Sequence, residues 1–240
     1  MLPTSARFAL WFSAWATGAA SLDDARDAIV ADDAAHDVAG LPGAEDVVPL
    51  ILALGRLRSG GTTGAGIALP VPGDPLGLAG PSDFNTHALD AGEGVVFAGA
   101  DIGLVPRRAG AGVVWSYYAA TSRRQVPDPA EADTSLRQAV LIAANTLADL
   151  DVARWRPEVA DELMALRQTA DFHFPDGMTP RALKLVSLST RCRTIVDLAL
   201  ADEGGAVSAT EAERRRAALS PLDHAARRAL VAACSFPWGR

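Results

Sequence analysis

The sequence predicts an α+β fold, in which amino-terminal helices and a small mixed β-sheet of about four strands pack against a carboxyl-terminal helical bundle. Three observations lead to this prediction. Apolar residues recur at helical spacing up to about residue 58. Between residues 60 and 120, β-branched and aromatic runs separated by glycine replace that spacing. Beyond residue 133, helical spacing returns.

The same changes of pattern divide the chain into three parts. Residues 1–120 hold the first helices and the sheet, and residues 134–240 hold the bundle. Residues 121–133 are polar and contain Pro127 and Pro129, so we expect a linker or crossover there. One cooperative unit and two separate domains are both compatible with this division.

The first part is expected to begin with three helices. One face of the first helix is formed by four aromatic residues at helical spacing: Phe8, Trp11, Phe12 and Trp15. Ser21 has the hydroxyl of a helix cap, and the helix after it is expected to run to about Asp37. A third helix is expected from Glu45 to Arg58, with Pro49 tolerated in its first turn.

Four strands are expected next, at Ile67–Val71, Val95–Ala98, Ile102–Val105 and Val113–Tyr118. Between the first two, Ser82 is expected to cap a short helix that Gly92 ends. The order strand, helix, strand allows a right-handed parallel crossover between those two strands. Glycine-containing turns predict that the last three strands form an antiparallel meander.

The last part is expected to be helical throughout. Apolar stripes occur at 136–150 and 159–170. Thr179 caps a helix that begins at Pro180, runs to Ala201 and is apolar on most sides. Two final helices are expected to start at Ser208 and Ser220, because each hydroxyl precedes a carboxylate by three residues.

Composition narrows the class of protein. The chain has 240 residues, of which 49% are hydrophobic, and this is enough for one large core or two small ones. The net charge of -7 argues against a protein whose main role is to coat nucleic acid or an anionic membrane, because both need a positive face. No apolar run reaches the ~18 residues that a membrane-spanning helix needs, so we expect no membrane span.

The two cysteines give no sign of a disulfide framework or a zinc site. Cys192 and Cys234 lie far apart in helix-like segments and lack the paired spacing of zinc ligands. We therefore expect two buried thiols and a cytoplasmic location, with no metal and no cofactor. A metal at His173, between Asp171 and Asp176, is the weaker interpretation, because aromatic neighbours that anchor a loop explain the same pattern.

The stretch after the third helix contains the candidate ligand site. Its glycine-rich beginning, Gly60–Gly66, lacks the lysine of a phosphate loop and follows the carboxyl end of a helix, so it is interpreted as a connection. The stretch Pro72–Asn85 instead leaves a strand and enters a helix, where open α/β sheets place ligands. The residues expected to supply polar contacts are Asp74, Ser82, Asp83, Asn85 and His87.

A second set of candidate residues consists of the arginines of the two expected final helices. A short turn between these helices resembles the spacing of a helix-turn-helix, whose basic edge contacts phosphates. Nearby carboxylates offset this charge, so a solvated face is the favoured interpretation. The arginines concerned are Arg214, Arg215, Arg216, Arg227 and Arg228.

Three hypotheses about function follow. The first is a non-catalytic intracellular protein that binds a partner protein or associates with itself, favoured by its apolar, alanine-rich helices. The second is a small-molecule binder or enzyme that uses the stretch Pro72–Asn85. The third is a nucleic-acid-binding regulator. The sequence contains no Gly-x-Ser-x-Gly elbow and no Ser-x-x-Lys motif, so catalytic residues stay unknown and enzyme activity is left open.

Overall fold

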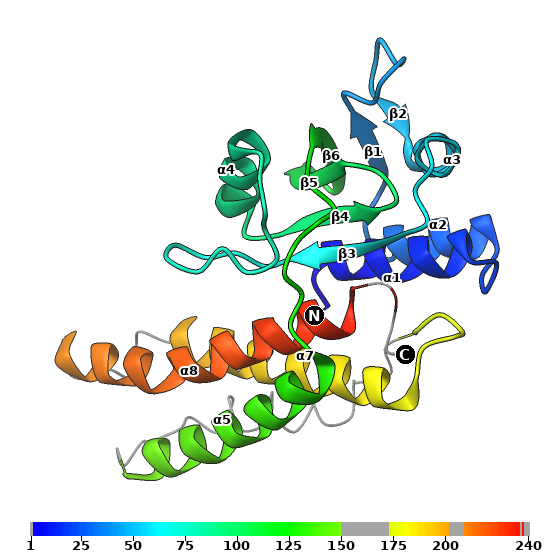
Figure 1. Ribbon diagram of the computed structural model, residues 1–240. Helices are drawn as coiled ribbons and strands as arrows, with labels where there is room; N and C mark the ends of the chain where they lie inside the picture. The colour runs from blue at the N-terminus through cyan, green and yellow to red at the C-terminus, as the bar shows by residue number, and fades with distance from the viewer. Residues whose placement is uncertain (1, 150–172, 202–208, 236, 238–240) are drawn as a thin grey trace.

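The computed structural model describes residues 2–149, 173–201, 209–235 and 237. Within these residues it contains seven helices and one six-stranded sheet (Figure 1). The helices are α1 (Thr4–Ala16), α2 (Leu22–Val30), α3 (Leu50–Ser59), α4 (Ser82–Ala91), α5 (Pro129–Asp149), α7 (Pro180–Ala201) and α8 (Ala209–Ala233). The strands are β1 (His36–Ala39), β2 (Val48–Pro49), β3 (Gly64–Ala68), β4 (Gly94–Ala98), β5 (Ile102–Ala109) and β6 (Gly112–Ala119).

The mixed sheet and the helical carboxyl-terminal part confirm the predicted class of fold, although the sheet has six strands rather than about four. The strand order is β2-β1-β6-β5-β4-β3. Strands β1 and β6 pair in parallel, and all other neighbours are antiparallel. Helix α1 covers one face of the sheet and α4 covers the other, while α5, α7 and α8 pack together beyond β3 (Figure 1).

Strands β3 and β4 are antiparallel, so the expected parallel crossover between them is wrong. The loop after β3 folds back on itself, with Leu69 N donating to Leu76 O and Val71 pairing with Asp74. This turn and α4 bring the chain back to the sheet so that β4 runs antiparallel to β3. The meander of β4, β5 and β6 is confirmed.

Two strands were missed because helices were expected in their place. The Ser21 cap is confirmed, since Ser21 Oγ accepts a hydrogen bond from Asp24 N at 3.0 Å. Helix α2, however, ends at Val30, where Ala31 adopts a positive φ of 47°, and β1 follows beside β6. The third helix begins at Leu50 rather than Glu45, because Val48 and Pro49 form the edge strand β2.

The main core lies between α1 and the sheet. Phe8 packs edge-on against Trp115, with ring centroids 4.8 Å apart, and Phe12 packs against Phe97 at 5.0 Å. All four of these side chains are fully buried. The predicted apolar face of α1 is therefore confirmed, and burial of this aromatic cluster gives the core much of its apolar area.

Helix α4 covers the opposite face through Phe84 and Ala88. Ser82 is the first residue of α4 and its side chain makes no cap hydrogen bond, so the expected Ser82 cap is wrong. Asn85 Oδ1 instead accepts a hydrogen bond from Gly80 N at 3.0 Å and ties the entering loop to the helix. Gly92 ends α4 in the left-handed conformation, as predicted.

Helix α7 spans Pro180–Ala201, as predicted. Helix α5 begins at Pro129, inside the expected linker 121–133, and α8 replaces two expected helices. Thr179 Oγ1 accepts a hydrogen bond from Ala182 N at 3.2 Å, which confirms the cap of α7. Helix α8 continues through Ser220 and Pro221, so the expectation of two final helices is wrong. Pro221 is exposed and leaves the buried apolar face of α8 intact, and packing on α5 and α7 offsets the missing hydrogen bond.

Both cysteines are free and buried, as expected. Burial raises the pKa of the Cys192 thiol to about 11 and also raises the pKa of Cys234. Among the described helices, none is long and apolar enough to cross a bilayer. Of the apolar stripe expected at 136–150, Leu136, Ala139 and Ala143 are buried in α5. The stripe expected at 159–170 lies outside the described residues.

Candidate functional site

The residues expected to form one site around Pro72–Asn85 lie in different surroundings. Asp74 Oδ2 accepts hydrogen bonds from His224 Nδ1 at 3.0 Å and from Arg227 Nη1 at 2.9 Å, both on α8. Asn85 accepts a hydrogen bond from Gly80 N in the loop before α4. Ser82 and Asp83 are exposed in the first turn of α4. His87 lies one turn further along and contacts the sheet. Of the five, we therefore assign only His87 to a cavity described below.

The glycine-rich stretch makes room for a side chain from the expected linker. Arg124 donates to Ile67 O at 2.6 Å, to Gly77 O at 3.2 Å and to Ser235 Oγ at 2.9 Å. A Cβ atom at Gly66 would overlap its guanidinium group. Desolvation lowers the pKa of Arg124 to about 10. These contacts join β3 to the end of α8.

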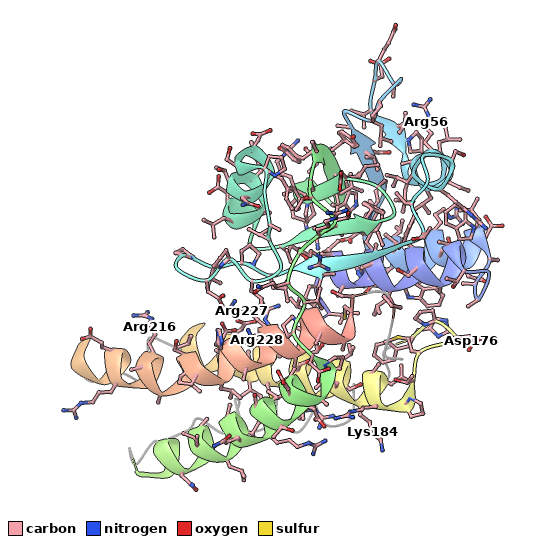
Figure 2. The ribbon with its side chains drawn as sticks, in the orientation of Figure 1. Arg56, Asp176, Lys184, Arg216, Arg227 and Arg228 are labelled. Carbon is pink, nitrogen blue, oxygen red and sulfur yellow. The ribbon has the colours of Figure 1, made fainter. Side chains whose placement is uncertain are left out.

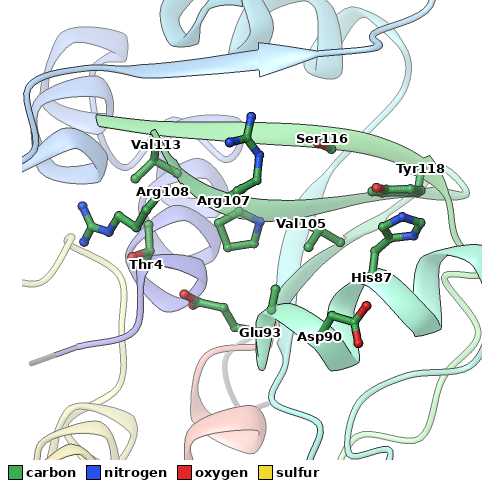
Figure 3. Close-up of a pocket in the computed structure, with 12 residues that line it drawn as sticks. Thr4, His87, Asp90, Glu93, Val105, Arg107, Arg108, Val113, Ser116 and Tyr118 are labelled. Carbon is green, nitrogen blue, oxygen red and sulfur yellow. The ribbon is translucent and has the colours of Figure 1, made fainter. Parts of the chain in front are cut away.

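A cavity of about 450 Å³ lies beside the β5–β6 hairpin, and we call it the hairpin cavity (Figure 3). Its walls come from the hairpin, from the second half of α4 and from the start of α1. The lining residues are Thr4, His87, Asp90, Ala91, Glu93, Val105, Pro106, Arg107, Arg108, Val113, Ser116 and Tyr118.

The cavity exists because the hairpin extends past its neighbouring strand. Strand β4 pairs with β5 only at Gly103 and Leu104, whereas β6 pairs with β5 as far as Ala109. The remainder of β5 thus has an open edge, which faces α4 and the first residue of α1. Pro106 on this edge cannot donate a backbone hydrogen bond, which discourages the addition of another strand.

His87 and Tyr118 form one wall of the hairpin cavity. Their rings stack, with centroids 4.7 Å apart (Figure 3). His87 Nδ1 lies 2.8 Å from the carbonyl oxygen of Asp83, and because a carbonyl can only accept, Nδ1 carries the proton. The lone pair of neutral His87 is therefore on Nε2. Burial and, second, the charge of Asp83 raise the pKa of Tyr118.

Some charged residues of the cavity have hydrogen-bond or ion-pair partners within the protein, and others have none among the described residues. Glu93 accepts a hydrogen bond from Ser5 N at 2.8 Å, where the positive end of α1 stabilises its charge. Arg108 is bound by Asp33. Arg107 and Asp90 form no hydrogen bond or ion pair with any residue that the structure describes. The cavity thus offers one unengaged cation and one unengaged carboxylate.

Comparison with known proteins shows the family. The model of the Rv1486c-like protein N-terminal domain matches residues 5–132, and that of the C-terminal domain matches residues 130–231. The chain belongs to the Rv1486c-like family. Uncharacterized protein Rv1486c of Mycobacterium tuberculosis strain H37Rv is 30% identical over 278 aligned residues, which cover 95% of each chain. Uncharacterized protein MT1533 of strain CDC 1551 gives the same figures, and no solved structure matches.

Behind the cavity of this Rv1486c-like chain lies a buried charge network. Asp33 Oδ2 accepts hydrogen bonds from Arg7 and from His36 Nε2, each at 2.9 Å, and Asp33 also binds Arg108. His36 is buried, and its Nδ1 accepts a hydrogen bond from Trp115 Nε1 at 3.2 Å. Since the indole can only donate, His36 is neutral with its proton on Nε2. The network holds the guanidinium group of Arg108, a residue of the cavity wall.

The network predicts loss of stability in acid. Burial raises the pKa of Asp33, but hydrogen bonds from His36, Arg108 and Arg7 lower it more, to about 2. Its stabilisation is therefore complete above the unfolded pKa of 3.8 and is lost as the pH falls towards 2. The contribution is at most about 2 kcal/mol, because Arg108 is exposed to screening.

His36 adds a second, milder dependence at higher pH. Burial lowers its pKa from 6.5, so the unfolded chain binds a proton more readily and stability decreases as the pH falls below 6.5. Urea unfolding between pH 7 and pH 3 should show both decreases, and His36→Gln should remove the upper one. An unfolding free energy that stays constant from pH 7 to pH 3 would contradict the network's role.

The arginines of this Rv1486c-like chain that were candidates for nucleic-acid binding differ in how far they are exposed. Arg227 is buried, whereas Arg214 and Arg216 are exposed and Arg228 is half-buried (Figure 2). The Arg215 side chain lies outside the described residues. A continuous α8 removes the turn on which the helix-turn-helix interpretation depended.

His173, the candidate metal ligand, is exposed and packs on the core from outside. His173 stacks on Trp11 with ring centroids 5.1 Å apart, which agrees with an anchored loop, and Asp171 lies outside the described residues. Within the described part of the chain, no group of three or more His, Cys, Asp or Glu side chains could hold a metal ion. Sequence reasoning selected His87 but missed Tyr118, Arg107 and Asp90, because only strand pairing brings them beside α4.

Proposed function

We propose that this protein binds a small acidic molecule with an apolar or aromatic body in the hairpin cavity. The observation that carries the proposal is the unengaged Arg107 in a cavity whose wall is the stacked His87–Tyr118 pair. The proposal keeps the second hypothesis from the sequence, a small-molecule site at α4, and moves it from the loop before α4 to the helix itself.

Size and lining support a small organic ligand. The volume of about 450 Å³ lies in the range of ligand sites, roughly 300–1,000 Å³. Val105, Pro106 and Val113 supply an apolar surface, and polar and charged side chains form most of the remaining lining. Aromatic rings stack favourably on such a wall, and an arginine fork binds a carboxylate or phosphate through two parallel hydrogen bonds.

The charge expected of the ligand follows from which charged side chains of the cavity already have partners within the protein. Glu93 is held at the start of α1 and Arg108 by Asp33, so neither needs a ligand. Arg107 is exposed and has no partner among the described residues, so it is available to bind an anionic group. His87 Nε2 can accept a hydrogen bond from a hydroxyl or protonated group on the ligand. Asp90, next to His87, favours a ligand whose acidic group lies at the Arg107 end.

Thermal unfolding with matched probes tests the proposal. We expect benzoate, indole-3-acetate or octanoate to raise the Tm by about 3–5 °C at ten times the Kd. The uncharged amides of the same acids should have less effect. Arg107→Gln should weaken binding about tenfold, while Arg56→Gln, an exposed arginine on α3, should not (Figure 2). No shift with any acid, or equal shifts with acids and amides, would reject the proposal.

The remaining hypotheses stay predictions. Association with a partner or with itself is tested by light scattering of the full chain, which gives the molecular mass in solution. Nucleic-acid binding is tested by retention on DNA at low salt and its loss in Arg214→Ala. Neither outcome depends on the hairpin cavity.

A further inference from the structure

A second cavity, of about 340 Å³, lies where the two halves of the molecule meet, and we call it the junction cavity. It is bounded by the start of α1, the end of β3, the turn after α4, and helices α7 and α8. Its lining residues are Leu2, Pro3, Thr4, Leu69, Ala91, Gly92, Glu93, Thr190, Arg193, Thr194, Asp197 and Leu230.

Helix α7 presents a polar stripe to this cavity. Thr190, Arg193, Thr194 and Asp197 are spaced i, i+3, i+4 and i+7, so they share one face of the helix. The sequence predicted an apolar helix here, which is normal for the middle of a bundle. Along this stripe Thr190 is buried, Arg193 and Thr194 are half-buried, and Asp197 is exposed. Polar groups that converge on a cavity are typical of a ligand site.

Part of this stripe lacks partners. Thr190 is only 2% exposed, yet its Oγ1 has no hydrogen-bond partner among the described residues. Arg193 Nε is likewise buried and unpaired, and it lies 3.9 Å from Asp223 Oδ1. Asp223 is bound more closely by Arg227, at 2.8 Å. A buried donor without an acceptor costs free energy, so an acceptor supplied by a ligand would relieve that cost.

Two carboxylates line the cavity, Glu93 opposite α7 and Asp197 on α7 itself. Glu93 uses Oε2 to accept from Ser5 N, and a carboxylate has further acceptor positions. Asp197, at the end of the α7 stripe, forms no hydrogen bond or ion pair with the described residues. The cavity therefore combines one arginine with two carboxylates, so a ligand that carries only an anionic group would leave Asp197 without a counter-charge.

We propose that the junction cavity binds a small zwitterion of the amino-acid class. The ligand carboxylate pairs with Arg193 and accepts from Thr190 after a rotation of the hydroxyl group. The ligand ammonium group lies between Asp197 and Glu93. This arrangement satisfies each charge with one of opposite sign, which neither a carboxylic acid nor an amine alone achieves.

The two cavities share Thr4, Ala91 and Glu93, so the sites are adjacent but chemically distinct. Glu93 lies beside Thr4 on the wall of the hairpin cavity (Figure 3). The junction site does not require the acidic ligand proposed above, because its arginine is on α7 and not on the hairpin. Arg193→Gln and Arg107→Gln therefore separate the two proposals.

The test is isothermal titration calorimetry of the full chain with free L-amino acids of small, apolar, acidic and basic side chain. We expect at least one to bind, and we expect its N-acetyl and amide derivatives to bind about tenfold more weakly or not at all. Arg193→Gln and Asp197→Asn should each weaken binding about tenfold. Lys184→Gln removes a charge from the exposed face of the same helix and should leave the affinity unchanged (Figure 2).

Three outcomes would overturn the proposal. One is the absence of binding by any amino acid at concentrations up to about 10 mM, a Kd of that size being too weak for specific recognition. Another is equal binding by the N-acetyl and amide derivatives. The last is a folded Arg193→Gln protein, verified by circular dichroism, that binds as tightly as the parent while Arg107→Gln does not, which would move the zwitterion to the hairpin cavity.

Discussion

Arg227→Ala is expected to lower the free energy of unfolding by about 3–5 kcal/mol. The Arg227 side chain is 5% exposed and has three acceptors. Its Nε donates to Asp223 Oδ2 at 2.8 Å, and its Nη1 donates to Asp74 Oδ2 at 2.9 Å and to Leu69 O at 3.0 Å. The substitution leaves all three acceptors without this donor, two of them charged.

The loss of Arg227 is expected to affect the stability of the whole molecule, because this side chain links its two parts. Asp74 belongs to the loop after β3, and Asp223 belongs to α8, so the guanidinium group holds the helical part against the sheet part. Urea unfolding followed by circular dichroism measures the effect. The neighbouring Arg228→Ala is the matched control, because Arg228 has no ion pair with the described residues, and its expected cost is within about 0.5 kcal/mol. Equal costs for the two substitutions would show that the contacts contribute little.

A conservative substitution separates charge from geometry. Arg227→Lys keeps the positive charge but cannot reach Asp223, Asp74 and Leu69 at once, because an ammonium group lacks the planar fork of guanidinium. We expect an intermediate loss of stability. The Arg227 network also shows the limit of sequence reasoning. Asp74 was expected to contact a ligand and Arg227 to lie on a solvated face, with phosphate binding as the alternative, whereas Arg227 is buried and binds Asp74.

Local patterns predicted the elements whose formation depends on neighbouring residues. The apolar face of α1, the Ser21 and Thr179 caps and the Gly92 stop follow from spacing and hydrogen-bonding groups a few residues apart. Strand β1 could not be predicted in this way, because it exists through parallel pairing with β6, far along the chain. In α8, packing overrode a strong local start signal at Ser220.

The same distinction applies to the candidate site. The sequence selected the stretch Pro72–Asn85 with five polar residues, and of these only His87 is in the cavity wall. Arg107 is on β5, Tyr118 is on β6, and the space between them and α4 results from the short pairing of β4 with β5. No property of Arg107 in the sequence distinguishes it from other exposed arginines. Register and strand length, which are tertiary properties, create the site.

Trp115→Ala is the other substitution with a large expected effect, about 3–5 kcal/mol of lost stability. Trp115 is fully buried and its ring contacts Phe8 at 4.8 Å between centroids. Removing the indole leaves a cavity at the centre of the main core, between α1 and β6. It also removes the donor to His36 Nδ1, so a buried acceptor is left unpaired.

Trp115→Phe separates packing from hydrogen bonding. Phenylalanine keeps most of the apolar area but cannot donate to His36, so we expect a smaller loss, about 1–3 kcal/mol. Chemical unfolding of both variants at pH 7 provides the comparison. If Trp115→Phe were as stable as the parent, the hydrogen bond to His36 would be unimportant for stability. If both variants lost equal stability, the hydrogen bond rather than the packing would dominate, and the His36–Asp33–Arg108 network behind the hairpin cavity would depend on this one donor.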